Sequence, residues 1–236
     1  MVFPSGQAAV FRPAAERFHT RLSWLDSWHT FSFAGHHDPS WMGFRSLRVI
    51  NDDRIEAGRG FGLHPHREME IITVMVEGRI RHSDSMGHSQ LLHAGEVQRM
   101  SAGTGLSHSE INDGSEPCRL LQIWIEPGSS GEAPAYEQKP FAIRPSWTPL
   151  IAPDRLHGAM AVNRAVRLWR AQPVADQTLS CLLSPGTHGW IQMVDGFGQA
   201  DGHALERGDG FGFAAGGVNQ FTAGPGGADL LLFELG

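Results

Sequence analysis

The sequence contains only two cysteines among its 236 residues, Cys118 and Cys181. Two cysteines provide neither a disulfide framework nor a paired CxxC zinc site, so we expect both to be reduced, packed thiols. A basic run is also missing, and the formal net charge is −6. This charge excludes the electrostatic footprint of a nucleic-acid-binding protein.

Long hydrophobic runs are absent as well. No stretch approaches the ~18 uninterrupted apolar residues of a membrane span, and the first residues, MVFPSGQAAVFRPAAERFH, lack the layout of a signal peptide. We therefore expect no membrane partner and a location in the cytoplasm. Hydrophobic residues make up 41% of the chain and charged residues 19%, which is typical of a folded soluble protein.

Helical periodicity is hard to find, and short apolar or alternating segments take its place. Most of them are bounded by Gly, Pro, Asn, Asp or Ser, and the chain has 29 glycines and 14 prolines. Such a pattern predicts an all-β fold of the sandwich or barrel type. The predicted strands are 47–50, 71–76, 90–93, 120–125, 181–183, 190–194 and 229–233.

A turn-rich connector, EPGSSGEAP, occupies residues 126–134. We therefore predict two domains, residues 1–132 and residues 133–236.

Short repeats link the two halves. The tripeptide that ends at Gly78 recurs at Gly196, and the Gly-acid pair at Gly95 recurs at Gly208. Each set brackets a hairpin-like stretch, so two related β-domains are the economical interpretation.

Histidine is concentrated in the first half, and four residues form a spaced constellation. His64 and His66 are two residues apart, as are His108 and Glu110. In a strand, such pairs share one face about 7 Å apart. Two pairs on neighbouring strands inside a barrel would converge on one point. Three imidazoles and a carboxylate suit a divalent transition metal with room for a further ligand: iron, manganese, nickel, copper or zinc.

The alternative for these residues is ordinary packing or surface exposure, because an isolated HxH is a weak signal. We assign the following histidines to surface or loop roles: His19, His36, His37, His82, His88, His93 and His157.

The same segment carries a family resemblance. Gly58, His64, His66 and Glu70 match the first cupin motif, G-x5-H-x-H-x3,4-E-x6-G, and Gly78 falls one residue late. Further matching stretches are WHTFSF (28–33), MGFRSLRVIN (42–51) and MSAGTGLSHSE (100–110). The chain resembles the pirin family of the cupin superfamily, in particular its short bacterial members described as quercetin 2,3-dioxygenases. This resemblance implies a bicupin, with two β-barrel or jelly-roll domains packed together.

The resemblance also bears on the metal ligands. In the commonest cupin pattern the fourth ligand is the glutamate of the first motif, here Glu70. In pirin-like proteins it is the glutamate two residues after the second-motif histidine, here Glu110. The alternation of side chains along a strand predicts that both glutamates face inward. We favour Glu110 as the ligand, with Glu70 orienting a ligand histidine or serving as the alternative ligand.

The second half has no counterparts of these ligands. Anchoring the two copies at their shared glycines places Leu182, Ser184, Phe221 and Ala223 at the four ligand positions. We therefore expect residues 133–236 to be a metal-free, cupin-like copy.

The resemblance implies a metal-dependent dioxygenase that cleaves a flavonol-type enol such as quercetin with O2 and releases CO. One divalent metal, with Fe(II) favoured, would bind the enolic oxygen, and Glu110, or less favourably Glu70, would act as general base. Two alternatives stay open. One is a pirin-like redox sensor or co-regulator that contacts a protein partner without enzymatic activity. The other is a different metal-dependent reaction on a small enolic or aromatic substrate.

Overall fold

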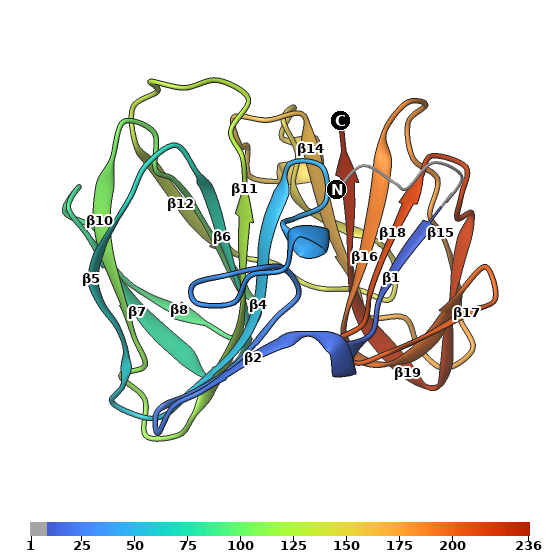
Figure 1. The fold of residues 1–236 in the computed structure, drawn as a ribbon, viewed down its shortest axis with the longest axis horizontal. Helices are drawn as coiled ribbons and strands as arrows, with labels where there is room; N and C mark the ends of the chain where they lie inside the picture. Colours follow the sequence, from blue (N-terminus) through green and yellow to red (C-terminus); the bar gives the residue numbers. More distant parts are fainter. Residues whose placement is uncertain (1–8) are drawn as a thin grey trace.

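The computed structural model describes residues 9–236 and shows two β-barrels side by side (Figure 1). Its helices within this range are three short 3-10 turns, η1 (Ala14–Glu16), η2 (Pro39–Trp41) and η3 (Leu156–Gly158). The predicted all-β fold is confirmed. Across residues 9–236, no helix has the length and apolar character needed to cross a membrane.

Two antiparallel sheets form the N-terminal barrel. The larger sheet contains β2 (Phe18–Arg21), β3 (Leu25–His29), β4 (Leu47–Ile55), β6 (Glu70–Glu77), β9 (Glu96–Ser101), β11 (Cys118–Ile125) and β12 (Ala135–Pro140). Their order is β12-β9-β6-β11-β4-β3-β2. The smaller sheet contains β5 (Gly60–His66), β7 (Arg79–Asp84), β8 (Ser89–His93) and β10 (Leu106–Ile111), in the order β5-β10-β7-β8.

The C-terminal barrel is built from one eight-stranded sheet. Its strands are β1 (Ala9–Arg12), β13 (Thr148–Ile151), β14 (Val166–Ala171), β15 (Thr178–Ser180), β16 (His188–Ala200), β17 (His203–Glu206), β18 (Gly210–Ala214) and β19 (Gln220–Leu235). The two longest strands, β16 and β19, pair with each other and shift register twice. Such bulges bend a strand, which lets a single sheet curve round its own core.

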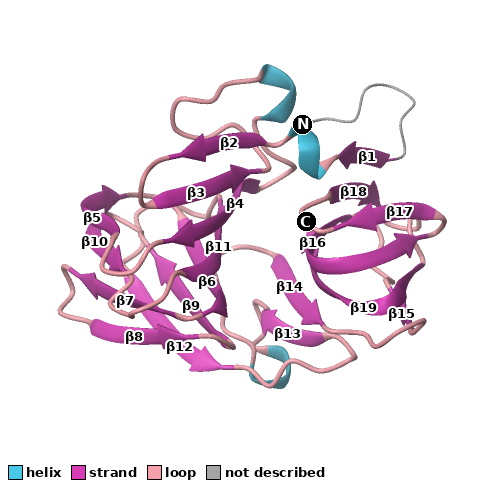
Figure 2. Ribbon diagram, turned by 90° about the horizontal axis from the view of Figure 1, so that it is seen from below, coloured by secondary structure: helices cyan, strands magenta, loops and turns pink. Residues whose placement is uncertain are grey.

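Sheet membership does not follow the predicted boundary between residues 132 and 133. β12 lies after that boundary and pairs with β9 of the N-terminal barrel, whereas β1 pairs with β18 of the C-terminal barrel (Figure 2). Each barrel therefore takes one strand from the other side of the boundary. The predicted strand at 181–183 is wrong, because β15 ends at Ser180. The other predicted segments lie within β4, β6, β8, β11, β16 and β19.

Two of the repeated glycines, Gly78 and Gly196, have the same left-handed backbone conformation. Gly78 joins β6 to β7 with a φ of 72°, and Gly196 lies at a register shift of β16 with a φ of 75°. A Cβ at position 78 would lie 2.9 Å from the Cβ of Cys118, and a Cβ at position 196 would lie 2.5 Å from the carbonyl oxygen of Gly227. Glycine avoids both the strain and the contact. The sequence repeat therefore marks a backbone position in each barrel that requires glycine.

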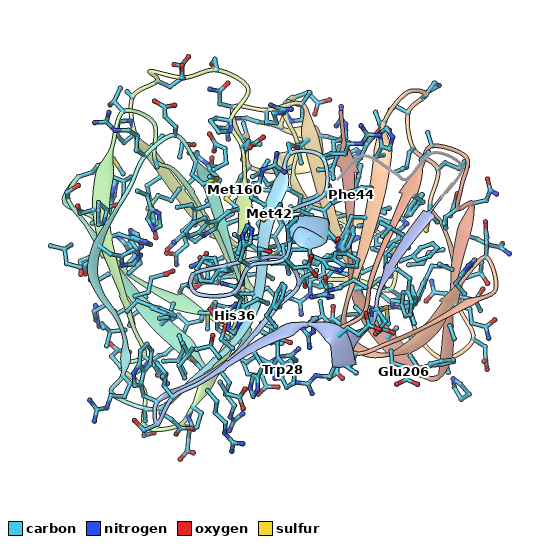
Figure 3. The ribbon with its side chains drawn as sticks, viewed as in Figure 1. Trp28, His36, Met42, Phe44, Met160 and Glu206 are labelled. Carbon is cyan, nitrogen blue, oxygen red and sulfur yellow. The ribbon has the colours of Figure 1, made fainter. Side chains whose placement is uncertain are left out.

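The most extensive apolar core lies between the barrels. Phe31 and Phe44 from the N-terminal half pack on Trp190 of β16, with ring centroids 5.0 and 5.2 Å from the Trp190 ring. All three side chains are at most 1% exposed, and Figure 3 shows Phe44 at the junction. Because this core is shared, we expect the two barrels to unfold together.

A polar row crosses the interior face of the seven-stranded sheet. Directly paired residues on neighbouring strands share a face. The pairing register aligns His29, Asn51, Gln122, Thr73 and Gln98 across β3, β4, β11, β6 and β9. All five side chains are buried. Buried polar groups need partners, so this row marks where the interior of the barrel departs from an ordinary apolar core.

Candidate metal centre

β5 and β10 bring three histidines together inside the N-terminal barrel. His64 pairs directly with His108 across these strands, and His66 follows two residues later on β5. The ring centroids of His64 and His66 lie 4.5 and 4.9 Å from that of His108. One nitrogen from each ring lies within 4.8 Å of the other two. Strand alternation therefore converges the three imidazoles as the sequence predicts.

Hydrogen bonding orients His64, and burial keeps His66 and His108 neutral. The Nδ1 of His64 lies 2.8 Å from the carbonyl oxygen of Gly62, so Nδ1–H donates and Nε2 is the nitrogen left for a metal. Burial, reinforced by neighbouring histidines, lowers the pKa of His66 to about 4 and that of His108 to about 2. Both rings are thus neutral at pH 7, which is the form that binds metals.

The Nε2 atom of His108 is the clearest sign that this cluster can bind a metal. His108 is fully buried, and this nitrogen has no hydrogen-bond partner among residues 9–236. A buried polar atom without a partner is costly, and a metal ion would satisfy it. Neutral imidazoles suit iron, nickel, copper and zinc, so the donor set fits a divalent transition metal.

Glu110 lies beside the three histidines in an adjoining cluster. Its carboxylate is within 4.8 Å of ligand nitrogens of His82 and His108. The amide of Gln122 donates to it at 2.8 Å, and the hydroxyl of Thr73 donates at 3.3 Å. Burial, then the charge of Asp53, raises the pKa of Glu110 to about 7. Of the four predicted ligands, the three histidines thus form one group, and Glu110 lies with His82 and His108 in a second group that shares His108.

Glu70 faces away from this cluster, and its predicted inward position is wrong. Thr73 of β6 contacts Glu110 inside the barrel, and Glu70, three residues earlier, is on the opposite face of the strand. Its carboxylate accepts a hydrogen bond from Ser101 Oγ at 2.6 Å. Ile72 shares the Glu70 face and belongs to the core between the barrels. The Glu70 carboxylate therefore lies on the other face of β6 from the candidate ligands.

This placement gives a testable difference between the two glutamates. We expect Glu70→Gln to leave metal affinity unchanged, because its carboxylate lies on the other face of β6. We expect Glu110→Gln to lower affinity by more than about 100-fold, because removal of a group that only supports a metal site already costs about 10- to 100-fold. Competition with a chromophoric chelator measures both. Loss of metal in Glu70→Gln with retention in Glu110→Gln would return Glu70 to the site.

A cavity of about 180 Å³ lies between the two sheets of the barrel. His64, His66 and Glu110 form one side of it. The rest of the lining combines aromatic rings with polar groups, namely Phe33, Phe61, Trp124, His29, Asn51 and Asp53. The Trp124 ring stands edge-on to both His66 and Phe33. An apolar pocket with a few convergent polar groups is the usual form of a small-molecule site.

Asp53, on the wall of this cavity, gives the metal-free protein a pH dependence. Burial raises its pKa to about 7 despite a hydrogen bond from Ser27. Because this exceeds the unfolded value of about 4, the proton binds the folded state more tightly. Its stabilising contribution is therefore present at low pH and is lost as the pH rises from about 4 to about 7.

We expect this effect to appear as a difference between the wild type and Asp53→Asn. The stability of the wild type relative to the variant should fall across this pH range, by at most about 1.4 kcal/mol per pH unit. Urea unfolding of both metal-free proteins at several pH values measures it. A difference that does not change with pH would contradict the assignment.

Sequence reasoning missed His82, which was assigned to a surface or loop role. The side chain is fully buried, and its Nδ1 lies 3.4 Å from the Nδ1 of His108. His82 and Asp84 have the same i, i+2 spacing as His64 and His66, and this spacing was the available signal.

Residues 11–125 match the Pirin family model, and residues 150–235 match the model described as Quercetinase C-terminal cupin domain. A protein of Escherichia coli K12 named quercetin 2,3-dioxygenase is 46% identical over 200 residues, covering 84% of this chain and 87% of that protein.

Two solved structures from Escherichia coli share the fold. The crystal structure of YhhW has a TM-score of 0.93 and 42% identity, and 97% of each chain is covered. A structure described as bacterial pirin YhhW in complex with nickel(II) has a TM-score of 0.92 and 42% identity, covering 96% of this chain and 98% of the other. The predicted bicupin architecture is confirmed, and the chain belongs to the pirin family of the cupin superfamily.

Proposed function

We propose that the chain is a metal-dependent dioxygenase that cleaves a flavonol-type enol with O2 and releases carbon monoxide. The observation that carries the proposal is the buried Nε2 of His108, which has no hydrogen-bond partner within residues 9–236. His108 is grouped with His64 and His66, which line the cavity between the sheets. The relative named quercetin 2,3-dioxygenase supports the same reaction class.

We assign one divalent transition metal to His64, His66 and His108, with Glu110 as the fourth ligand. Iron(II) is the favoured ion, and the nickel(II) complex of the solved relative makes nickel the second ion to test. When bound, the ion supplies a Lewis-acid centre with open positions for oxygen ligands.

The chain's own residues bind the substrate and move a proton. Glu110 has a raised pKa and lies at the cavity, so its carboxylate can accept the proton of an enolic hydroxyl. Gln122 and Thr73 hold the two carboxylate oxygens in place. Phe33 and Trp124 contact the flat face or edge of an aromatic ring and exclude water from it.

Cavity size limits how the substrate enters. The volume of about 180 Å³ is below the roughly 300–1,000 Å³ of pockets that enclose a drug-sized ligand. We therefore propose that the oxygenated ring of the flavonol enters the cavity and that the remaining ring lies at its mouth.

Oxygen uptake with quercetin tests this function. Metal-free protein is reconstituted separately with iron(II), manganese(II), nickel(II) and copper(II), and O2 consumption and CO release are followed together. We expect equimolar O2 uptake and CO release with at least one ion, and neither with His64→Ala. Absence of both products with every ion, in protein shown to contain the ion, would contradict the proposal.

A further inference from the structure

A line of polar side chains leads from His108 away from the cavity. His82 and Asp84 lie two residues apart on β7, and the pairing of β7 with β10 places Asp84 opposite His108. The side chains of His82, Asp84 and His108 are all fully buried. Three polar side chains are thus buried together behind the candidate ligand.

Hydrogen bonds join these side chains and continue to the surface. The Nδ1 atoms of His108 and His82 are 3.4 Å apart, and the Nε2 of His82 is 3.1 Å from Oδ2 of Asp84. The same carboxylate accepts from Nδ1 of His88 at 2.9 Å and from the backbone amide of Met86 at 2.9 Å. The His88 side chain is 39% exposed. This series of hydrogen-bonded side chains therefore connects the buried His108 to solvent.

The positions of the protons follow once Nε2 of His108 binds a cation. Its hydrogen must then be on Nδ1, which donates to Nδ1 of His82. Because His82 accepts at Nδ1, it carries its own hydrogen on Nε2 and donates to Asp84. In both hydrogen bonds, from His108 to His82 and from His82 to Asp84, the donor therefore lies on the His108 side and the acceptor on the Asp84 side.

Tyr136 of β12 holds the two outer imidazoles. Its ring stacks on His82 at 4.8 Å between centroids and on His88 at 4.7 Å, with interplanar angles of 24° and 22°. Its hydroxyl donates to Oε1 of Gln138 at 2.7 Å. β12, which lies after the predicted domain boundary but pairs with β9 of the N-terminal barrel, therefore completes this arrangement.

We propose that His82 and Asp84 are positioning residues that lock His108 in the tautomer whose Nε2 faces the metal. A carboxylate behind a ligand histidine fixes the orientation of the ring and raises its basicity. The inference rests on the metal site of the proposed function. It excludes a second ion between His82, His108 and Glu110, because a proton occupies the contact between the two imidazoles.

Zinc(II) is the probe, because it is diamagnetic and needs no turnover. Long-range 1H–15N spectra of the zinc-loaded protein, labelled with 15N-histidine, report which nitrogen of each ring carries hydrogen. We expect His108 to be protonated on Nδ1 and His82 on Nε2, with one zinc per chain. A hydrogen on Nδ1 of His82, or two zinc ions per chain, would overturn the proposal.

Asp84→Asn provides the second measurement, since it keeps the size of the side chain and removes its charge. We expect a 10- to 100-fold loss of zinc affinity and a mixture of His82 tautomers. Asp113→Asn is the matched control. Asp113 pairs with Arg79 and Arg81 at the surface of the same barrel, so affinity and tautomers should not change.

The outcomes separate this inference from the function on which it rests. Failure of the wild type to bind zinc would remove the metal site itself. Zinc binding with wild-type affinity and tautomers in Asp84→Asn would refute the positioning role and leave the metal site intact. If Asp84→Asn does not fold, the wild-type spectrum alone decides the tautomers.

Discussion

Replacement of His108 by alanine should abolish stoichiometric binding of a divalent transition metal. His108 is the residue shared by both clusters of candidate ligands, and its Nε2 has no other partner among the described residues. Removal of a supporting group costs about 10- to 100-fold in affinity, so loss of a direct ligand should exceed about 100-fold. Elemental analysis after dialysis against each metal measures the effect.

His93→Ala is the matched control for this variant. His93 is an exposed histidine of β8 in the same four-stranded sheet, so its removal should leave the metal content unchanged. Circular dichroism and the Tm of each variant show whether the fold is retained. Equal metal content in folded His108→Ala and the wild type would contradict the assignment.

The second large effect is expected at the junction of the barrels. Trp190→Ala should lower the free energy of unfolding by about 3–5 kcal/mol, the usual cost of removing a buried large aromatic side chain. Trp190 is 0% exposed and packs on Phe31 and Phe44 from the other half of the chain. Both barrels should therefore be destabilised and should still unfold in one cooperative transition. Urea unfolding followed by circular dichroism measures this.

Leu182→Ala serves as its control. This leucine belongs to the same half of the chain and is 77% exposed, so its replacement should change stability by no more than about 0.5 kcal/mol. Two separate unfolding transitions in Trp190→Ala, with the N-terminal barrel unaffected, would show that the core between the barrels does not couple them.

Alternation within single strands made much of the site predictable. His64 and His66 share a face because they are two residues apart on β5, and the same spacing places His108 and Glu110 on one face of β10. The converging histidines therefore follow from local geometry together with the expectation of a barrel.

Glu70 shows where this reasoning fails. Residues 67–69 separate β5 from β6, and Glu68 has a positive φ of 49°. The alternation of inward-facing and outward-facing side chains along β5 does not continue through such a turn, because the backbone enters β6 in a new orientation. As a result Glu70 was expected inside the barrel and lies on its outer face.

Contacts between segments that are distant in the sequence were the other feature that could not be predicted. The sequence around Tyr136 is irregular, and only the pairing of β12 with β9 shows that this residue stacks on His82 and His88. Likewise, the burial of His82 depends on its strand lying beside β10. Neither pairing leaves a periodic signal in the sequence, so the polar chain behind His108 emerged only from the structure.

Anomalous X-ray scattering at the nickel edge, from crystals of the nickel(II)-loaded protein, tests the central claim most directly. The account predicts one strong peak inside the N-terminal barrel, bonded to one ring nitrogen each of His64, His66 and His108. Absence of a peak between these three nitrogens, or a peak only elsewhere on the chain, would contradict it.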